Sequence, residues 1–80
     1  MSKQEIKDKV FDTLSDISGS DNISENDKLQ EDLGLDSLGL VSLLLSLEDS
    51  FEIVLDESDM NPFDLITVND VIILMEKYNE

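Results

Sequence analysis

The segment from Ser37 to Ser50 predicts a helix that is apolar on two opposite sides. At about 100° of rotation per residue, one side carries the larger apolar set: Leu40, Leu43, Leu44, Leu47 and Phe51. A second row, formed by Leu38, Val41 and Leu45, lies on nearly the opposite side and is continued by Glu48. A helix that is apolar all round is usually buried, but a chain of 80 residues is too small to cover both sides. The second row is therefore either an exposed partner surface rimmed by acids or a further face of the core.

The chain before this segment predicts a first helix and then a long loop. Ser2 and Glu5 have the spacing of a capping box, which indicates a helix over about residues 3 to 17. The inward stripe of this helix recurs at helical intervals: Ile6, Val10, Leu14 and Ile17. Residues 18 to 36 show no period, and a loop this long is uncommon in a compact domain. We expect four apolar residues to hold it on the core: Ile23, Leu29, Leu33 and Leu35.

The chain after the central segment predicts one short turn of helix and a last longer helix. Asp56 can cap the short turn, and Pro62 closes it because the residue before a proline disfavours helix. Thr67 and Asp70 form a second capping signal for a helix that ends near Asn79. Its inward stripe is Val68, Val71, Ile72 and Met75. Residues 1 to 80 are therefore expected to form one all-α domain, a four-helix bundle with three longer helices, one short helix and a long first loop.

The charge distribution restricts the class of partner. The formal net charge is -15, and from Leu29 to Glu76 the sequence has twelve acidic residues and no basic one. Such a field repels nucleic acid and anionic lipid and attracts basic protein surfaces, unless it merely keeps a small domain soluble. The N-terminus has no apolar export region, and no apolar run approaches membrane-spanning length. We therefore expect a monomeric cytoplasmic protein with no nucleic-acid partner and no stable membrane association.

Intrinsic catalysis is disfavoured by the residues that the sequence lacks. There is no histidine and no cysteine, so a serine nucleophile has no imidazole base and thiolate metal sites are excluded. No glycine-rich loop with a lysine is present to hold a phosphate. An EF-hand loop beginning at Asp21 would lack its glycine and its final glutamate. We expect a protein that is not an enzyme and holds no metal.

Ser37 stands at the start of the central helix, directly after Asp36. From its position alone, two interpretations are open. Ser37 is an ordinary helix-capping residue, or it is modified by another protein. A phosphate diester on Ser37 would lie against the positive end of the helix dipole and its free amides.

Several motifs together point to a known family. Asp32-Leu33-Gly34-Leu35-Asp36-Ser37-Leu38 is followed by Val41, by Leu47-Glu48-Asp49-x-Phe51 and by Ile53. Later in the chain, Phe63-Asp-Leu-Ile-Thr-Val has the form of that family's approach to its last helix. With these motifs the whole chain closely resembles the acyl carrier protein family. Asp-Ser-Leu alone is a weak match, but the longer motif followed by a helix is specific.

The resemblance implies a covalent cofactor on Ser37. In this family a phosphopantetheinyl transferase moves 4′-phosphopantetheine from coenzyme A onto the serine. The arm ends in a thiol that carries cargo as a thioester, so a chain without cysteine acquires its sulfur in this way. Acyl-loading and synthase enzymes with basic surfaces then perform the chemistry, and tethering raises the effective concentration of the cargo at each of them.

The resemblance also implies roles for other side chains. It places partner recognition on the outward side of the central helix, at Asp36, Leu38, Val41, Leu45 and Glu48. It places the lining of an acyl cavity on the inner side and beyond, at Leu43, Leu47, Phe51, Ile53 and Ile72. Steering by charge favours fast encounter with a partner, and a small apolar contact allows fast release.

The sequence departs from the fatty-acid carriers at two positions. Those carriers usually have acids where this chain has Gly39 and Ser42, so the recognition surface here is less acidic. The expected function is to carry acyl groups in fatty-acid or polyketide-type biosynthesis, with a D-alanyl, aminoacyl or peptidyl carrier as the alternative. A more distant alternative is an acidic helical adaptor that binds its partner without modification.

Overall fold

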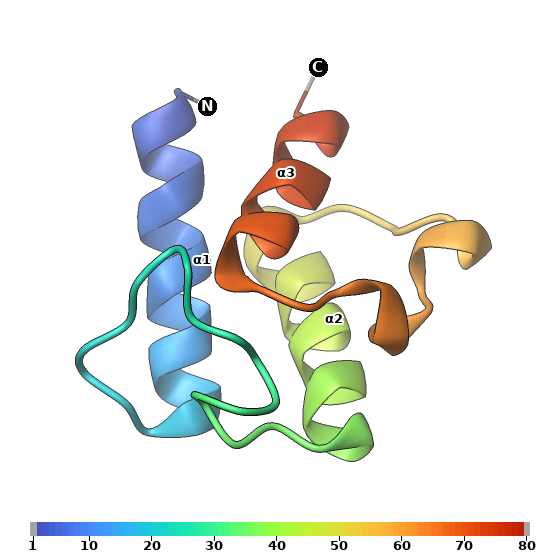
Figure 1. Ribbon diagram of the computed structural model, residues 1–80. Coiled ribbons are helices and arrows are strands. Elements are labelled where there is room, and N and C mark those ends of the chain that lie inside the picture. The colour runs from blue at the N-terminus through green and yellow to red at the C-terminus, as the bar shows by residue number, and fades with distance from the viewer. Residues whose placement is uncertain (1, 80) are drawn as a thin grey trace.

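The computed structural model describes residues 2 to 79, which form three α-helices and two 3-10 turns (Figure 1). The helices are α1 (Lys3–Ser18), α2 (Ser37–Phe51) and α3 (Val68–Tyr78), and the turns are η1 (Glu57–Asp59) and η2 (Pro62–Asp64). Residues 2 to 79 contain no strand, although an isolated bridge pairs Lys28 with Thr67. The predicted all-α class is confirmed.

The predicted four-helix count is not confirmed. In place of one short helix between Asp56 and Pro62, the chain makes the separate turns η1 and η2, and neither contains a buried residue. Asn61 is extended, with φ of -81° and ψ of 108°, because the proline that follows it disfavours the helical region. A single helix therefore cannot run through both turns, and no apolar stripe is present to stabilise one.

The helix ends follow the capping signals closely. Reciprocal capping boxes form at Ser2 with Glu5 and at Thr67 with Asp70. The helix α1 ends one residue later than predicted, before Gly19, whose φ is 73°. The helix α2 also runs one residue further, through Phe51, and ends at Glu52 with a left-handed φ of 55°.

The core lies between the three helices and is completed by the long loop. Its fully buried side chains include Val10 and Leu14 of α1, Leu44 of α2 and Val71 of α3. The predicted pinning of the loop is confirmed: Leu29 and Leu35 are buried, and Ile23 and Leu33 pack against the core.

The outer row of α2, which consists of Leu38, Val41 and Leu45, is exposed. The exposed fractions of these side chains are 76%, 37% and 54%, respectively. The alternative that the row is a second core face is therefore wrong.

The long loop leads from α1 to α2, and it is hydrogen-bonded to the residues at the start of α3. In Figure 1 it crosses α1 before it reaches the first turn of α2. The N–H of Val68 donates to the carbonyl of Asp27 at 3.0 Å, and the N–H of Leu29 donates to the carbonyl of Ile66 at 2.9 Å. The first of these bonds satisfies an amide of α3 that has no partner within its helix. The chain leading to Ser37 is thereby fastened to the start of α3.

Candidate modification site

Ser37 is the first residue of α2, and it is exposed. The N-cap is Asp36, whose carboxylate accepts a hydrogen bond of 2.8 Å from the N–H of Gly39. The carbonyl of Asp36 accepts from the N–H of Leu40 at 2.9 Å. Asp36 therefore caps the helix without Ser37, whose hydroxyl makes no hydrogen bond within residues 2 to 79. The interpretation of Ser37 as the helix cap is wrong.

The surroundings of Ser37 suit a phosphate group. The first turn of α2 contains no acidic residue, and the carboxylate of Asp36 is turned onto the amide of Gly39. The first amides of a helix have no partner within it and lie at the positive end of its dipole. A phosphate diester on the Ser37 oxygen would therefore meet hydrogen-bond donors and a favourable field.

The loop before Ser37 is closed by its own hydrogen bonds. The N–H of Lys28 donates to the carboxylate of Asp32 at 2.7 Å, and the N–H of Asp32 donates back to the carbonyl of Lys28 at 2.8 Å. The N–H of Leu35 donates to the carbonyl of Leu29 at 3.0 Å, and the side chain of Leu35 is buried. This closed turn presents Ser37 at the surface from a fixed base.

The predicted partner residues fall into two groups. Asp36 and the three residues of the outer row are exposed along α2. Glu48 is only half-exposed, and its carboxylate accepts a hydrogen bond of 2.8 Å from the N–H of Leu55. The carbonyl of Glu48 also accepts from the N–H of Ile53 at 3.0 Å. Glu48 therefore holds the chain that follows α2, in addition to continuing the outer row.

Sequence reasoning missed several exposed apolar side chains outside α2. The turn η2 packs against α2, and its Phe63 is 63% exposed. Further exposed members are Val54, Ile66 and Ile73. A three-residue turn has no period to reveal which way its side chains face. The available signal was a large apolar residue directly after Pro62.

Most lysines are engaged within the protein. Within residues 2 to 79 the ion pairs are Lys7 with Glu25, Lys28 with Glu31 and Lys77 with Asp59. The hydrogen bond to Glu25 raises the pKa of Lys7. Lys9 donates to the carbonyl of Ser50 at 2.8 Å. None of these lysines lies on α2, so the acidic field around the outer row is left uncompensated there.

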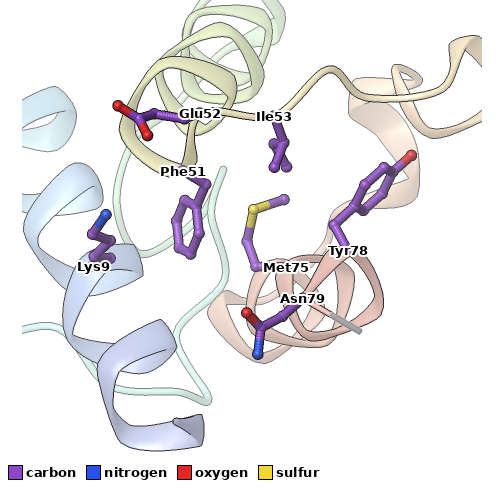
Figure 2. A pocket seen from close by; sticks show the side chains of 7 residues that line it. All are labelled: Lys9, Phe51, Glu52, Ile53, Met75, Tyr78 and Asn79. Carbon is purple, nitrogen blue, oxygen red and sulfur yellow. The ribbon is translucent and has the colours of Figure 1, made fainter. Parts of the chain in front are cut away.

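A cavity of about 210 Å³ lies where the C-terminal ends of α2 and α3 face α1 (Figure 2). Its lining consists of Lys9, Phe51, Glu52, Ile53, Met75, Tyr78 and Asn79. Two of the predicted acyl-cavity residues, Phe51 and Ile53, belong to this lining. The other three, Leu43, Leu47 and Ile72, are fully buried in the core. The cavity is at the opposite end of α2 from Ser37, roughly 20 Å away along a helix of this length.

Residues 2 to 79 lack two features that would indicate another kind of site or location. No group of three or more acidic, histidine or cysteine side chains is placed to hold a metal ion in this part of the chain. Among the helices of the same residues, none combines the length and the apolar character that crossing a bilayer requires.

Comparisons with known proteins agree with this geometry. Residues 8–74 match the family model for the phosphopantetheine attachment site. The acyl carrier protein of Thermotoga maritima is 37% identical over 78 residues, which cover 95% of this chain and 94% of that protein. The acyl carrier protein of Desulforapulum autotrophicum is 39% identical over 72 residues, 90% of each chain. A solved structure of a candidate acyl carrier protein from Mycobacterium tuberculosis superposes with a TM-score of 0.80 at 32% identity, covering 91% of this chain and 97% of that one.

The matched region is thus a phosphopantetheine-attachment domain, and the chain belongs to the acyl carrier protein family. Its cofactor is 4′-phosphopantetheine. It is a carrier and not an enzyme. Members of the family are modified by phosphopantetheinyl transferases and interact with synthase enzymes.

Proposed function

We propose that Ser37 is the attachment point of 4′-phosphopantetheine and that this chain carries acyl groups in fatty-acid or polyketide-type biosynthesis. The observation that carries the proposal is the free, exposed hydroxyl of Ser37 beside a helix cap supplied entirely by Asp36. When bound, the group supplies a terminal thiol for thioester formation, which a chain without cysteine lacks. The cytoplasm, where coenzyme A and a transferase are available, is the proposed location.

We propose that the outer row and Asp36 form the surface on which partner enzymes dock. Its apolar side chains are exposed, and the charges around it are acidic. A partner with a basic patch beside a small apolar contact would be steered onto it by charge. Because η2 packs against α2, exposed Phe63 is proposed to extend this surface.

The proposed acyl cavity includes the seam between α2 and α3. No Cα atom of α2 lies within 8 Å of a Cα atom of α3, so the two backbones are not closely packed. Leu47 of α2 and Ile72 of α3 are both fully buried in the core. Side chains can shift more readily than packed backbones, which supports widening of this seam around an acyl chain. Phe51 and Ile53 already border open volume at its far end, and Leu43 is proposed to complete the lining.

The observation behind a second candidate cargo, a D-alanyl, aminoacyl or peptidyl group, is that Gly39 stands where fatty-acid carriers usually have an acid. At Gly39 a Cβ atom would stand 3.3 Å from Leu35 and 3.4 Å from the capping carboxylate of Asp36. A residue larger than glycine would press on this cap, so local packing also disfavours an acidic side chain at position 39. Mass spectrometry of the thioester-bound group on protein from its native host distinguishes the two kinds of cargo.

Intact mass measurement tests the attachment directly. The purified chain is incubated with coenzyme A and a broad-specificity phosphopantetheinyl transferase, and it is expected to gain the mass of one phosphopantetheine group. Ser42→Ala is the matched control, because Ser42 is another exposed serine of α2 and its loss should leave the gain unchanged. A gain that persists in Ser37→Ala refutes Ser37 as the attachment point. No gain in the native chain refutes the modification itself and favours the unmodified adaptor.

A further inference from the structure

A smaller pocket, of about 50 Å³, lies between the long loop and the residues just before α3. Its lining consists of Lys28, Gln30 and Glu31 of the loop together with Leu65 and Ile66. Leu65 is buried, and Ile66 is 54% exposed. The pocket shares no lining residue with the cavity of about 210 Å³ at the far end of α2. None of its residues belongs to the proposed acyl cavity, so this pocket has no role yet.

Hydrogen bonds fix the backbone around the pocket. The carbonyl of Ile66 accepts from the N–H of Leu29 at 2.9 Å, and the N–H of Ile66 donates to the carboxylate of Asp70 at 3.0 Å. The carbonyl of Leu29 accepts in turn from the N–H of Leu35 at 3.0 Å. The walls of the pocket are therefore held in place before any ligand enters, which lowers the cost of binding.

The same hydrogen bonds place the pocket close to Ser37. Leu35 is two residues before Ser37, and its hydrogen-bonded partner Leu29 is joined to Gln30 by a peptide bond. By the lengths of these connections, the backbone nitrogen of Gln30 lies within roughly 14 Å of the Cα atom of Ser37. From the serine oxygen to its sulfur, 4′-phosphopantetheine is as long as about five extended residues, roughly 17 Å. An arm attached to Ser37 is therefore long enough to reach the pocket.

The side chains of the pocket match the uncharged part of that arm. Lys28 and Glu31 form an ion pair at 3.4 Å, so together they add no net charge. The side-chain amide of Gln30 makes no hydrogen bond within residues 2 to 79 and can bond to one of the two amides of the arm. The apolar surfaces of Leu65 and Ile66 suit its two geminal methyl groups. A fatty-acyl chain is too large for a pocket of about 50 Å³.

We propose that this pocket holds the pantetheine part of the arm on Ser37 while no acyl group is loaded. The inference rests on the proposed attachment at Ser37 and adds the place where the arm lies. A short tether gives an effective concentration in the millimolar range, so a dissociation constant of about 1 mM keeps the pocket occupied about half of the time. A contact this weak is released quickly when the arm enters a partner enzyme.

Nuclear magnetic resonance of the modified full-length chain tests the position of the arm. The sequence has no cysteine, so a thiol-reactive nitroxide spin label attaches to the arm alone. The label should broaden the amide signals of Gln30 and Ile66 about threefold more than that of Leu45, which lies roughly 12 Å from Ser37 along α2. Without the label, the side-chain amide signal of Gln30 should shift when the chain is modified.

Two isoleucine variants show whether the pocket causes these effects. Ile66→Ser removes an apolar wall of the pocket. Ile73→Ser is the matched control, because Ile73 is 56% exposed and does not line the pocket. Ile66→Ser should lower the excess broadening at Gln30 about threefold, the change expected for losing a half-exposed apolar side chain, and Ile73→Ser should leave it unchanged. If Ile66→Ser fails to fold, Gln30→Ala replaces it and is followed through the amide of Ile66.

Intact mass separates this proposal from the attachment itself. A chain that gains no phosphopantetheine on Ser37 overturns both. A chain that gains it, but in which the label broadens Leu45 as strongly as Gln30, overturns the position of the arm and leaves the attachment standing. An equal response of Ile66→Ser and Ile73→Ser overturns the position of the arm in the same way.

Discussion

The carboxylate of Glu48 accepts a hydrogen bond of 2.8 Å from the backbone N–H of Leu55. This bond joins the outer face of α2 to the segment that follows the helix, because Glu48 continues the outer row and Leu55 is a buried residue of that segment. A partner cation that approached this carboxylate would have to share it with an amide of the protein itself. Docking on α2 and the position of the segment after it are therefore physically connected at Glu48.

Glu48→Ala should destabilise the fold. The N–H of Leu55 would lose its acceptor, and an unsatisfied, largely buried amide costs about 1 to 2 kcal/mol. For a domain of this size the melting temperature falls by roughly 4 to 8 °C per kcal/mol. Glu48→Gln keeps a carbonyl oxygen and should recover most of the loss. Urea unfolding measures both variants, and equal destabilisation by the two would show that the hydrogen bond is not the cause.

Asp36 has a capping role that can be separated from its charge. Asp36→Ala should lower the free energy of unfolding by about 1 kcal/mol, the usual cost of losing an N-cap. Asp36→Asn keeps the capping oxygen and should cost only a few tenths of that amount. If the negative charge serves partner recognition, both variants should slow the modification of Ser37. Normal modification of a stable Asp36→Asn protein would limit the role of Asp36 to the cap.

Glu52 occupies a conformation that suits glycine. Its φ of 55° lies in the left-handed region, which costs a residue with a Cβ atom roughly 1 to 2 kcal/mol. Glu52→Gly should therefore raise the free energy of unfolding by about 1 kcal/mol. Glu52→Ala is the control, because it removes the charge at the helix end but retains the Cβ atom. Thermal unfolding should rank Glu52→Gly as the more stable; the reverse order would contradict the prediction.

The hydrogen bonds of Tyr78 and Lys77 to the carboxylate of Asp59 should contribute to stability only within a window of pH. The hydrogen bond from Tyr78, with those from Lys77, lowers the pKa of Asp59 below its ordinary 3.8. This contribution is present above that pH and is lost as the pH falls through the folded-state pKa. The bond to Asp59 raises the pKa of Tyr78 above 10.0, so that contribution is present below pH 10.0 and is lost as the pH rises through the folded-state value.

The stability difference between the native chain and Tyr78→Phe should therefore be largest from about pH 5 to pH 9 and shrink on both sides. Chemical unfolding at a series of pH values measures it, with Lys3→Met as the reference for general charge effects. A difference that is constant from acid to alkaline pH would contradict these pKa shifts.

The crowding of acids predicts a response to salt. Twelve acids and no base lie from Leu29 to Glu76, and their repulsion is screened once the Debye length falls to about 10 Å near 0.1 M salt. The melting temperature should rise as sodium chloride is increased from about 0.01 M to about 0.2 M. Magnesium chloride at matched ionic strength separates screening from cation binding. A melting temperature insensitive to both salts would show that repulsion is unimportant.

The sequence was sufficient for features that depend on near neighbours in the chain. The capping box at Ser2, the cap at Asp36 and the capping box at Thr67 each use residues three apart, so their spacing alone indicates where the helices begin. The small size of the chain favoured exposure of the outer row, but the structure was needed to exclude a second core face. The prediction of a short fourth helix was not confirmed, because the capping signal at Asp56 was not followed by an apolar stripe long enough to stabilise a helix.

Only the tertiary structure showed which distant groups meet. The bonds of Glu48 with Leu55, of Lys9 with Ser50 and of Tyr78 with Asp59 join residues 7, 41 and 19 positions apart. No periodicity relates such positions, because their contact depends on how the helices pack and where the loops return. By itself the sequence determined the three longer helices, the acidic field and the serine motif. Packing decided that the Ser37 hydroxyl is free, that Glu48 is bonded to the segment after α2, and that a cavity lies at the far end of α2.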